Sequence, residues 1–381
     1  MTNSHDADVI VLGLGGMGSA AAYHLARRGR SVIGLEQYGP AHDRGSSHGR
    51  SRIIREAYFE HPDYVPLIQR AYELWAALEQ EAGSRLFLPT GGLMIGPADG
   101  TLVQGALTSA QRHGLTYELL PAAEIRRRYP AFAVGDEAVA VWEKRAGVLF
   151  PEACTLAHLE QAARAGALLR TEERVVDWRV RDGAVEVRTD RSRYTAGRLV
   201  VTAGPWAGQV LADLALPLQV ERNVMYWFRP TDPAAFNAER LPIYIYEYQR
   251  DGFIYGFPEV AGDGVKVAHH HSGEFCTPET IQREVTPAEV RRMRAILART
   301  LPALSGDLLG AVTCMYTNTP DGHFIIDTHP RHPQVIVACG FSGHGFKFAA
   351  VVGEIVAELA IEGRSRHPIA LFRLARFARP A

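Results

Sequence analysis

The chain has 381 residues, which is too long for one compact core and indicates two domains. Its 41 Lys and Arg residues nearly balance 42 Asp and Glu residues, so no net field would attract nucleic acid or an acidic membrane. Hydrophobic residues make up 47% of the chain and charged residues 22%, as is usual for globular proteins. No apolar run approaches the roughly 20 residues that a membrane-spanning helix needs.

The cysteines and the N-terminal region give no redox or targeting signal. Cys154, Cys276, Cys314 and Cys339 are widely scattered and form no CxxC pair, which argues against a zinc site or a disulfide framework. A cleavable signal peptide is not expected, because a glycine turn begins at Gly13 and cleavage would remove part of the fold. We therefore expect a cytoplasmic protein.

The stretch Val9–Glu36 predicts a dinucleotide-binding unit. A short apolar run, typical of a strand buried on both faces, leads into Gly13, Gly15 and Gly18 with the spacing GxGxxG. The first glycine permits a tight turn, the second lets the backbone approach a pyrophosphate, and the third lets helix and strand pack closely. A helix-prone segment and a second apolar run follow, and that run ends at Glu36, whose carboxylate can accept hydrogen bonds from ribose hydroxyls. These residues alone do not distinguish NAD from FAD.

A polar, glycine-rich loop, Tyr38–His48, then runs into Arg52 and Arg55, which are separated by two isoleucines. We expect the two arginines on one face of a helical turn, or on either side of a buried turn. A solvated basic patch is the alternative. The glycines and the isoleucines favour a backbone folded around a ligand.

Apolar spacing predicts the remaining elements. The predicted helices cover Pro62–Glu81, Ala122–Tyr129, Pro151–Ala165, Ala207–Leu214, Pro287–Leu301 and Phe346–Ile361. The predicted strands cover Leu93–Ile95, Ala167–Leu169, Val175–Val180, Val185–Thr189, Arg198–Thr202, Leu218–Phe228, Pro242–Phe257, Gly264–His270, Phe324–Asp327 and Val335–Ala338. This order predicts a mixed α/β (α+β) fold, in which a Rossmann-like nucleotide-binding domain is interrupted by an antiparallel-sheet domain. We assign residues 1–85, 150–218 and 322–381 to the first domain, and 86–149 and 219–321 to the second.

The amino end of the last helix is a second candidate for an anion site. Gly343 and Gly345 precede it, and its free N–H groups would stabilise negative charge such as the N1–C2=O edge of a reduced flavin. Lys347 has the wrong sign for that helix end and fits better if it faces an anionic ligand. The alternative, to which we give equal weight, is a Lys347 side chain that is simply exposed to solvent.

The sequence alone predicts no catalytic or binding role for three further features. Lys266 lies between Val265 and Val267, so an alternating strand would point it to solvent. The run His269–His271 does not predict a metal site, because adjacent residues on a strand face opposite sides and no carboxylate cluster accompanies them. Cys314 has no charged neighbour along the chain, which is typical of a buried structural cysteine.

Taken together, the chain resembles the monomeric sarcosine oxidase and N-methyltryptophan oxidase group, flavoenzymes of the wider D-amino-acid-oxidase-like fold. The resemblance is spread over nearly the whole length. It is sharpest in five motifs that occur in matching order: Gly13–Gly18, Gly45–Tyr58, Thr202–Trp206, Cys314–Asp327 and Gly340–Phe348. Such a set is specific for the family and much less so for the substrate.

The resemblance implies a bound FAD and a role for each matching residue. Cys314 matches the cysteine that bonds through sulfur to the 8α-methyl group of FAD, in place of the structural role. Arg55 and Lys347 match the pair that binds the substrate carboxylate, which suits a guanidinium and an ammonium. Lys266 matches a lysine that holds a water against flavin N5 and speeds the reaction with oxygen, and Arg52 matches an arginine beside the flavin ring.

The other implied site residues form two sets. The substrate cavity would be lined by Tyr255, His270, Tyr316 and His344, and catalytic roles are expected for Arg52, Lys266, Tyr255 and His270. The residues expected to bind FAD are Gly13, Gly15, Met17, Gly18, Glu36, Ser46, His48, Ser51, Arg52, Val175, Ala203, Gly204, Trp206, Cys314, Gly343, His344, Gly345, Phe346 and Lys347.

The activity implied is the FAD-dependent oxidation of a secondary amine that carries a carboxylate. An N-methyl amino acid such as sarcosine would become an imine that hydrolyses to formaldehyde and the primary amino acid, while O2 is reduced to H2O2. The alternatives are an oxidase of the same fold for a cyclic imino acid such as proline or pipecolate, or a biosynthetic amine oxidase. Two alternatives belong to another class of protein: a nicotinamide-dependent dehydrogenase and a non-catalytic nucleotide-binding protein. The expected partners are the amine and O2, without nucleic acid, membrane or metal, in a monomer or homodimer.

Overall fold

The N-terminal strand β1 (Ala7–Leu12) lies in the middle of an eight-stranded sheet in the computed structural model, which describes residues 5–260 and 262–377. Five strands run parallel in the order β9-β2-β1-β12-β20, and β19, β10 and β11 extend the sheet by antiparallel pairing. The bounds of the other strands are β2 (Val32–Leu35), β9 (Leu168–Arg170), β10 (Val175–Arg181), β11 (Ala184–Thr189), β12 (Arg193–Val201), β19 (Ile325–His329) and β20 (His332–Cys339).

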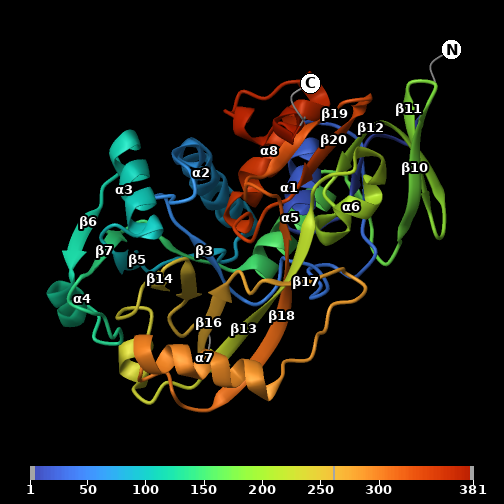
Figure 1. The fold of residues 1–381 in the computed structure, drawn as a ribbon. Helices are drawn as coiled ribbons and strands as arrows, with labels where there is room; N and C mark the ends of the chain where they lie inside the picture. Colours follow the sequence, from blue (N-terminus) through green and yellow to red (C-terminus); the bar gives the residue numbers. More distant parts are fainter. Residues whose placement is uncertain (1–4, 261, 378–381) are drawn as a thin grey trace.

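Strand β1 is buried on both faces, as its unbroken apolar run predicts. Val9 and Val11 pack into the core beneath the helices, whereas Ile10 and Leu12 pack into the core on the opposite face of the sheet. The helices whose side chains fill the first core are α1 (Gly16–Arg27), α2 (Val65–Ala82), α5 (Pro151–Arg164) and α8 (Ala349–Glu362). Figure 1 places α8 beside α1, although more than 300 residues separate them in the chain.

The second sheet has nine strands and lies in the lower half of Figure 1. Its pairings are antiparallel except for the parallel pair β14 and β5. Its strands are β5 (Gly92–Pro97), β6 (Glu118–Pro121), β7 (Ala138–Glu143), β13 (Gln219–Phe228), β14 (Ile243–Gln249), β15 (Gly252–Gly256), β16 (Val265–His270), β17 (Glu274–Cys276) and β18 (Leu308–Asn318). The helices α3 (Thr101–His113), α4 (Ala122–Arg128) and α7 (Pro287–Thr300) contribute to the cores on its two faces.

A small third sheet connects the two large ones. It consists of β3 (Arg52–Ile54), β8 (Gly147–Leu149) and β4 (Phe87–Pro89). The helical turn considered for Arg52 and Arg55 is therefore wrong. The intervening isoleucines are β-branched and favour extended backbone, and Ile53 pairs with Val148 of β8.

Several other elements differ from the sequence prediction, and two of them are helical. The helix predicted over Ala207–Leu214 is a single turn, α6 (Ala207–Val210), followed by a 3-10 turn over Ala212–Leu214. Helix α3 was not predicted, because Gly105 and three Thr and Ser residues weaken its helical propensity. Its buried stripe of Leu102, Val103, Ala106 and Ala110 nevertheless packs against the second sheet.

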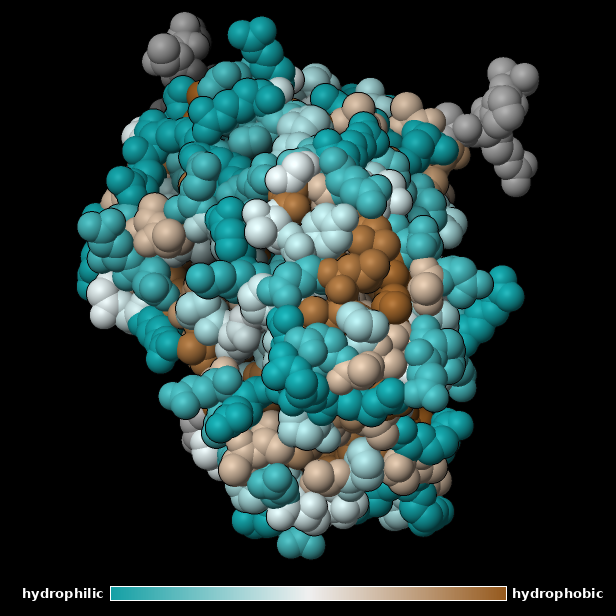
Figure 2. Space-filling view, turned by 90° about the vertical axis from the view of Figure 1, so that its left-hand side faces the viewer, coloured by the Kyte–Doolittle hydropathy of each residue, from teal (hydrophilic) through white to brown (hydrophobic). Residues whose placement is uncertain are grey.

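The predicted fold class is confirmed: a Rossmann-like sheet and a mainly antiparallel sheet alternate along the chain. The domain boundaries stay a prediction. Over the described ranges, no helix is both long and apolar enough to cross a membrane. Figure 2 shows a largely hydrophilic face, with its largest hydrophobic area right of the centre and smaller ones elsewhere.

Candidate active site

A cavity of about 790 Å³ lies where the carboxyl ends of the parallel strands meet the second sheet. Its walls include Leu12, Leu35 and Thr202, at or just beyond the ends of β1, β2 and β12, and Tyr255 and Cys314 from the antiparallel sheet. The edge formed by the carboxyl ends of strands is the usual ligand site of an open α/β sheet. The volume is within the range of about 300–1,000 Å³ that is typical of small-molecule and cofactor sites.

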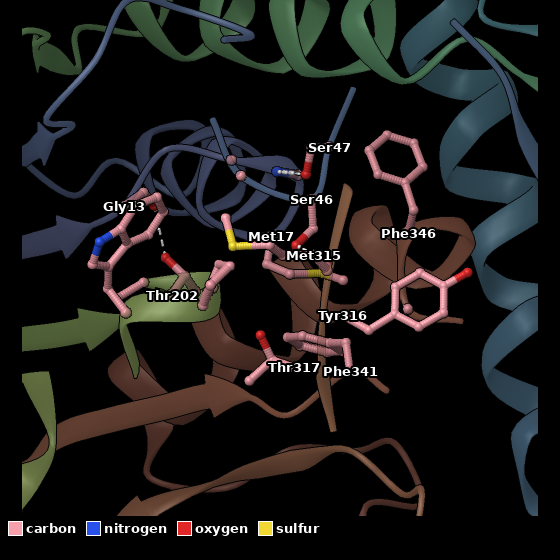
Figure 3. A pocket seen from close by; sticks show the side chains of 18 of the residues that line it. Gly13, Met17, Ser46, Ser47, Thr202, Met315, Tyr316, Thr317, Phe341 and Phe346 are labelled. Carbon is pink, nitrogen blue, oxygen red and sulfur yellow. Dashed lines mark hydrogen bonds between the residues drawn. The ribbon is translucent and has the colours of Figure 1, made fainter. Parts of the chain in front are cut away.

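The glycine turn forms one end of this cavity. Gly13 has a φ of +88°, and a Cβ added there would lie 2.7 Å from the carbonyl oxygen of Thr202. Figure 3 shows the two residues side by side, with Thr202 Oγ1 donating a hydrogen bond to the Gly13 carbonyl at 2.8 Å. A Cβ on Gly18 would lie only 1.7 Å from the carbonyl oxygen of Gly13, so only glycine at position 18 lets α1 pack onto the turn. The free N–H groups of the first turn of α1 therefore face the cavity.

Glu36 is held rigidly beside this turn. Its Oε2 accepts a hydrogen bond from the backbone N–H of Leu14 at 2.9 Å, and its Oε1 accepts one from Tyr38 at 3.1 Å. The side chain is buried and lines the cavity. A carboxylate has further lone pairs, which remain for hydroxyl donors of a ligand.

The loop after β2 closes over the middle of the cavity. Ser47 Oγ accepts a hydrogen bond from the N–H of Gly16 at 3.0 Å, and Ser46 Oγ donates one to the Met315 carbonyl at 2.6 Å. Figure 3 shows these contacts between the glycine turn and β18, with Met17 and Tyr316 at the same cavity. The loop thus ties the nucleotide-binding end to the strand that carries Cys314.

Cys314 has a charged neighbour in space that the sequence did not reveal. Its Sγ lies 3.8 Å from Nη2 of Arg52, and the thiol is buried but lines the cavity. The guanidinium is fixed by donating to the carbonyls of Ser46 at 2.7 Å and Ser51 at 2.9 Å. A cation is therefore positioned beside the sulfur.

Arg55 and Lys347 meet at the wall of the same cavity and are 1% and 6% exposed. Arg55 donates to Glu60 Oε2 at 2.6 Å and to the Ala57 carbonyl at 2.7 Å, while Lys347 donates to the His344 carbonyl at 2.7 Å. Burial opposes the charge of Arg55, but the Glu60 carboxylate outweighs it and raises the pKa of the guanidinium. Burial and the charge of Arg55 lower the pKa of Lys347 to about 7. This pair can bind an anion.

The opposite wall is neutral and aromatic. The hydroxyl of Tyr316 lies 3.5 Å from that of Tyr255 and 3.5 Å from Nδ1 of His270. Burial lowers the pKa of His270 well below its usual range and raises the pKa of both tyrosines. The three side chains are therefore uncharged near neutral pH. His344 is also neutral there, since burial lowers its pKa to about 4.

Lys266 does not point to solvent as the alternation predicts. It is 2% exposed, and its ammonium donates to the carbonyls of Gly49 and Ser51, both at 2.8 Å. Burial and the charge of Arg52 lower its pKa well below the usual range. It lines a side cavity of about 90 Å³ that it shares with Ser51, not the large cavity.

Most of the predicted site residues meet at the large cavity. Those that line it are Gly13, Gly15, Met17, Glu36, Ser46, Arg52, Arg55, Val175, Ala203, Gly204, Trp206, Tyr255, His270, Cys314, Tyr316, Gly343, His344, Gly345, Phe346 and Lys347. Those that lie behind its wall are Gly18, His48, Ser51 and Lys266. His48 is buried there, and this burial lowers its pKa to about 3.

Comparison with known proteins decides the class. Residues 8–359 match the family model described as FAD dependent oxidoreductase. The chain belongs to this family.

Curated relatives and solved structures agree with that membership. The chain is 51% identical over 375 residues to a monomeric sarcosine oxidase of Streptomyces avermitilis, which covers 97% of this chain and 98% of the relative. It is 35% identical to the N-methyl-L-tryptophan oxidase of Yersinia pestis, over 98% of this chain and all of the relative. Among solved structures, the open form of NikD, described as an unusual amino acid oxidase, superposes with a TM-score of 0.84 at 25% identity and covers 97% and 98% of the two chains. These matches argue against the alternative of a nicotinamide-dependent dehydrogenase.

The residues of this FAD-dependent oxidoreductase fit the cofactor. A Cβ on Gly16 would lie 3.0 Å from the ring of Phe346, so a side chain at this position of the glycine cradle, Gly13–Gly18, would press on a residue that lines the cavity. The cavity is continuous from this cradle and the fixed Glu36 to Cys314 and Lys347, as a long dinucleotide requires. Gly13, Glu36 and the N–H groups of α1 would hold the ADP portion.

Sequence reasoning missed several residues of the site. Glu60, the ion-pair partner of Arg55, follows it by five residues in a loop, and an acidic residue near an arginine is too common to be a signal. Phe59 and Ile245 also line the cavity but read as ordinary apolar residues. Only the assembled fold brings them to the site.

Two groups of potential metal ligands occur in the described ranges. They are Asp213, His329 and His332, and Glu354, Glu358 and His367. Both lie outside the cavity lining, and arginine side chains pair with their carboxylates. The run His269–His271 belongs to neither group.

Proposed function

We propose that this FAD-dependent oxidoreductase oxidises an N-methyl amino acid of the sarcosine type. The imine product would hydrolyse to formaldehyde and the primary amino acid, and O2 would be reduced to H2O2. The observation that carries the proposal is the single cavity in which the glycine cradle is continuous with Cys314 and with the cationic pair Arg55 and Lys347. The identity to sarcosine oxidases supports the substrate class.

The substrate carboxylate would bind to Arg55 and Lys347. A guanidinium can bind a carboxylate through two parallel hydrogen bonds, and a nearby ammonium adds a point charge. Arg55 uses one N–H for the Ala57 carbonyl and one for Glu60, so further N–H groups of the guanidinium remain for an incoming carboxylate. Binding would also favour the charged form of Lys347, whose pKa is about 7 in the free protein.

The substrate amine would bind in its neutral form, which is the form that can be oxidised. The cations Arg52, Arg55 and Lys347 lie around the cavity, and a positive charge there disfavours a second one on the amine. Tyr255 and Tyr316 provide an uncharged wall for the N-methyl group. Holding the carboxylate and the amine together orients one C–H bond, which is catalysis mainly by positioning.

When bound, FAD accepts the electron pair and proton equivalents that leave this C–H bond. We infer that Cys314 holds the cofactor covalently and that Arg52, beside its sulfur, orients the ring. Lys266, behind the wall formed by Ser51, would assist the reaction of the reduced cofactor with oxygen. The cytoplasmic location and the monomeric or homodimeric state stay predictions.

A substrate panel tests the function. Purified holoenzyme should release H2O2 and formaldehyde with sarcosine or another N-methyl amino acid, and should do so much faster than with glycine, proline or pipecolate. Faster turnover of proline or pipecolate would replace the proposal by the cyclic imino acid oxidase. If none of these compounds bleaches the cofactor under anaerobic conditions, the substrate class is wrong.

A substitution of Arg55 tests the proposed carboxylate site. Arg55→Ala should raise the KM for sarcosine at least about tenfold, because a charged hydrogen-bond pair is lost. The matched control is Arg112→Ala, an exposed arginine on α3 that pairs only with Asp63 among the described side chains. Equal KM values for the two variants would contradict the assignment of Arg55.

A further inference from the structure

Glu143 is a buried carboxylate that the proposed chemistry has not used. It ends strand β7 and is 3% exposed. Its Oε1 accepts a hydrogen bond from the backbone N–H of Glu56 at 2.8 Å, and its Oε2 accepts one from Ala57 at 2.7 Å. Two consecutive peptide N–H groups are thus bound by the two oxygens of one side chain.

The segment held in this way, residues 56–57, carries the carbonyl group on which Arg55 rests. Nη1 of Arg55 donates to the carbonyl of Ala57 at 2.7 Å, and its Nη2 donates to Glu60. Nε of the same guanidinium is buried and has no hydrogen-bond partner within the part of the chain that the structure describes. The direction of the guanidinium therefore depends on the Ala57 carbonyl, and the position of Ala57 depends on its N–H bond to Glu143.

The arrangement favours the ionised form of Glu143. Two N–H donors are matched best by two carboxylate oxygens, whereas in a neutral carboxyl group one oxygen carries a proton and becomes a poorer acceptor. Arg55 lies close enough to favour the charge, and Glu56 opposes it. The other charged or titratable groups around the carboxylate are Tyr72 on α2 and Arg145, and Arg145 pairs with Glu56 at 2.9 Å.

We propose that Glu143 is a positioning residue for the carboxylate site: its ionised side chain holds the segment 56–57, whose Ala57 carbonyl aims Arg55, and carboxylate affinity falls when that charge is lost. This inference rests on the proposed function, because it assumes that Arg55 binds the substrate carboxylate. Glu143 itself touches neither substrate nor cofactor in this scheme.

The pH dependence of carboxylate binding follows from the geometry. Burial raises the pKa of Glu143 to about 7, so its carboxylate forms, and affinity rises, as the pH increases through about 7. Lys347 acts in the opposite direction, because its pKa of about 7 means that its positive charge is lost over the same range. The wild-type profile should therefore have a rising and a falling limb, and variants can separate them.

The test measures the dissociation constant of acetate for the purified holoenzyme by calorimetry, from about pH 5.5 to about pH 8.5, where acetate is ionised. Glu143→Gln should weaken binding about tenfold near pH 8 and should lose the rising limb, because its amide presents a donor to one of the two N–H groups. Glu143→Asp keeps two acceptors and should keep the rising limb at reduced affinity. A purely structural role would weaken both variants without this difference in the pH profile.

Glu56→Gln is the matched control, since it removes from the same loop a carboxylate that pairs with Arg145 and makes no hydrogen bond with the Ala57 backbone. It should keep both limbs, with the rising limb moved to lower pH because a negative neighbour of Glu143 is gone. Lys347→Met gives a second test that does not depend on the folding of Glu143 variants. It should show the rising limb alone, and a flat profile would overturn the proposal.

The outcomes separate this inference from the proposed function. If wild-type protein binds acetate and Glu143→Gln binds it equally well with an unchanged profile, the role of Glu143 is wrong and the carboxylate site stands. If wild-type protein binds no acetate at any pH, the carboxylate site fails and this inference fails with it.

Discussion

The contact between Arg52 and Cys314 illustrates how the site depends on single residues that are remote in sequence. The sulfur and the guanidinium nitrogen lie 3.8 Å apart, although 262 positions separate the two residues. A charged neighbour matters for a cysteine because sulfur reacts as the thiolate. The local sequence around Cys314 contains no charge, so its chemistry is visible only in the assembled fold.

Replacement of Cys314 tests the covalent attachment. Denatured wild-type protein should stay yellow after removal of free cofactor, and denatured Cys314→Ala should be colourless, because the covalent link is lost. Absorbance of the washed, denatured protein measures this. Cys276→Ala is the control, a half-buried cysteine outside the cavity lining that should keep the colour. Colour retained by Cys314→Ala would place the attachment elsewhere.

The sequence predicted the roles of some site residues and gave no signal for others. Gly13, Gly18 and Glu36 follow from local spacing, because each is required by the backbone of one turn. Lys266 was ambiguous because strand alternation does not tell whether both faces of the strand are covered. Glu143 gave no signal at all, since an acidic residue at a strand end is ordinary until its two N–H partners, more than 85 positions away, are known.

At the scale of elements, the sequence predicted best those helices and strands whose burial pattern is local. The apolar stripe of α2 and the unbroken apolar run of β1 are examples. It predicted α6 too long, since the backbone leaves the helical conformation at Leu211, where φ is −114° and ψ is 37°. The sequence did not predict which strands pair, because hydrogen bonds such as those of β5 with β14 join segments that are distant in the chain.

The contact between α1 and α8 positions the glycine cradle and can be tested. A Cβ on Gly353 would lie 2.5 Å from the Cβ of Ala20, so Gly353→Ala forces the two helices apart. Overpacking of this kind typically costs about 1–3 kcal/mol. The thermal midpoint should fall, and the fraction of purified protein that carries FAD should fall as well because α1 carries the cradle.

Gly208→Ala is the matched control for this prediction. It lies in α6, where an added Cβ would meet no atom within 4 Å, and alanine favours helix. Its thermal midpoint should be unchanged or slightly raised. Equal midpoints for Gly353→Ala and wild type would contradict the close packing of α1 and α8.

At the scale of the whole molecule, the cavity is built from segments that span most of the chain. The glycine turn, Ser46 and its loop, Cys314 and Lys347 come from both ends and from both large sheets. The five sequence motifs marked most of these segments but did not say that they share one cavity. The structure supplies that connection because β12 pairs with β1 and β20 pairs with β12, which places the C-terminal part in the same sheet as β1.

Glu354 holds the helical side of the molecule together. Its buried carboxylate accepts hydrogen bonds from Arg70 of α2 at 2.8 and 2.9 Å, and from Arg366 at 2.8 Å in the segment after α8. His367 lies 2.9 Å from the same carboxylate. One side chain of α8 thereby fixes both α2 and the following segment.

Loss of this charge should destabilise the whole fold in a pH-dependent way. Burial works against the Glu354 carboxylate, but the hydrogen bonds from Arg70 and His367 outweigh it and keep its pKa below the usual range. A group with a lowered pKa contributes stability above its unfolded pKa and loses it as the pH falls through its folded pKa. Glu354→Gln should therefore reduce the free energy of unfolding by about 2 kcal/mol near pH 7, and the difference from wild type should shrink on acidification. Chemical denaturation across pH measures this, with exposed Glu160→Gln as the control; an equal loss in both variants would contradict the role of Glu354.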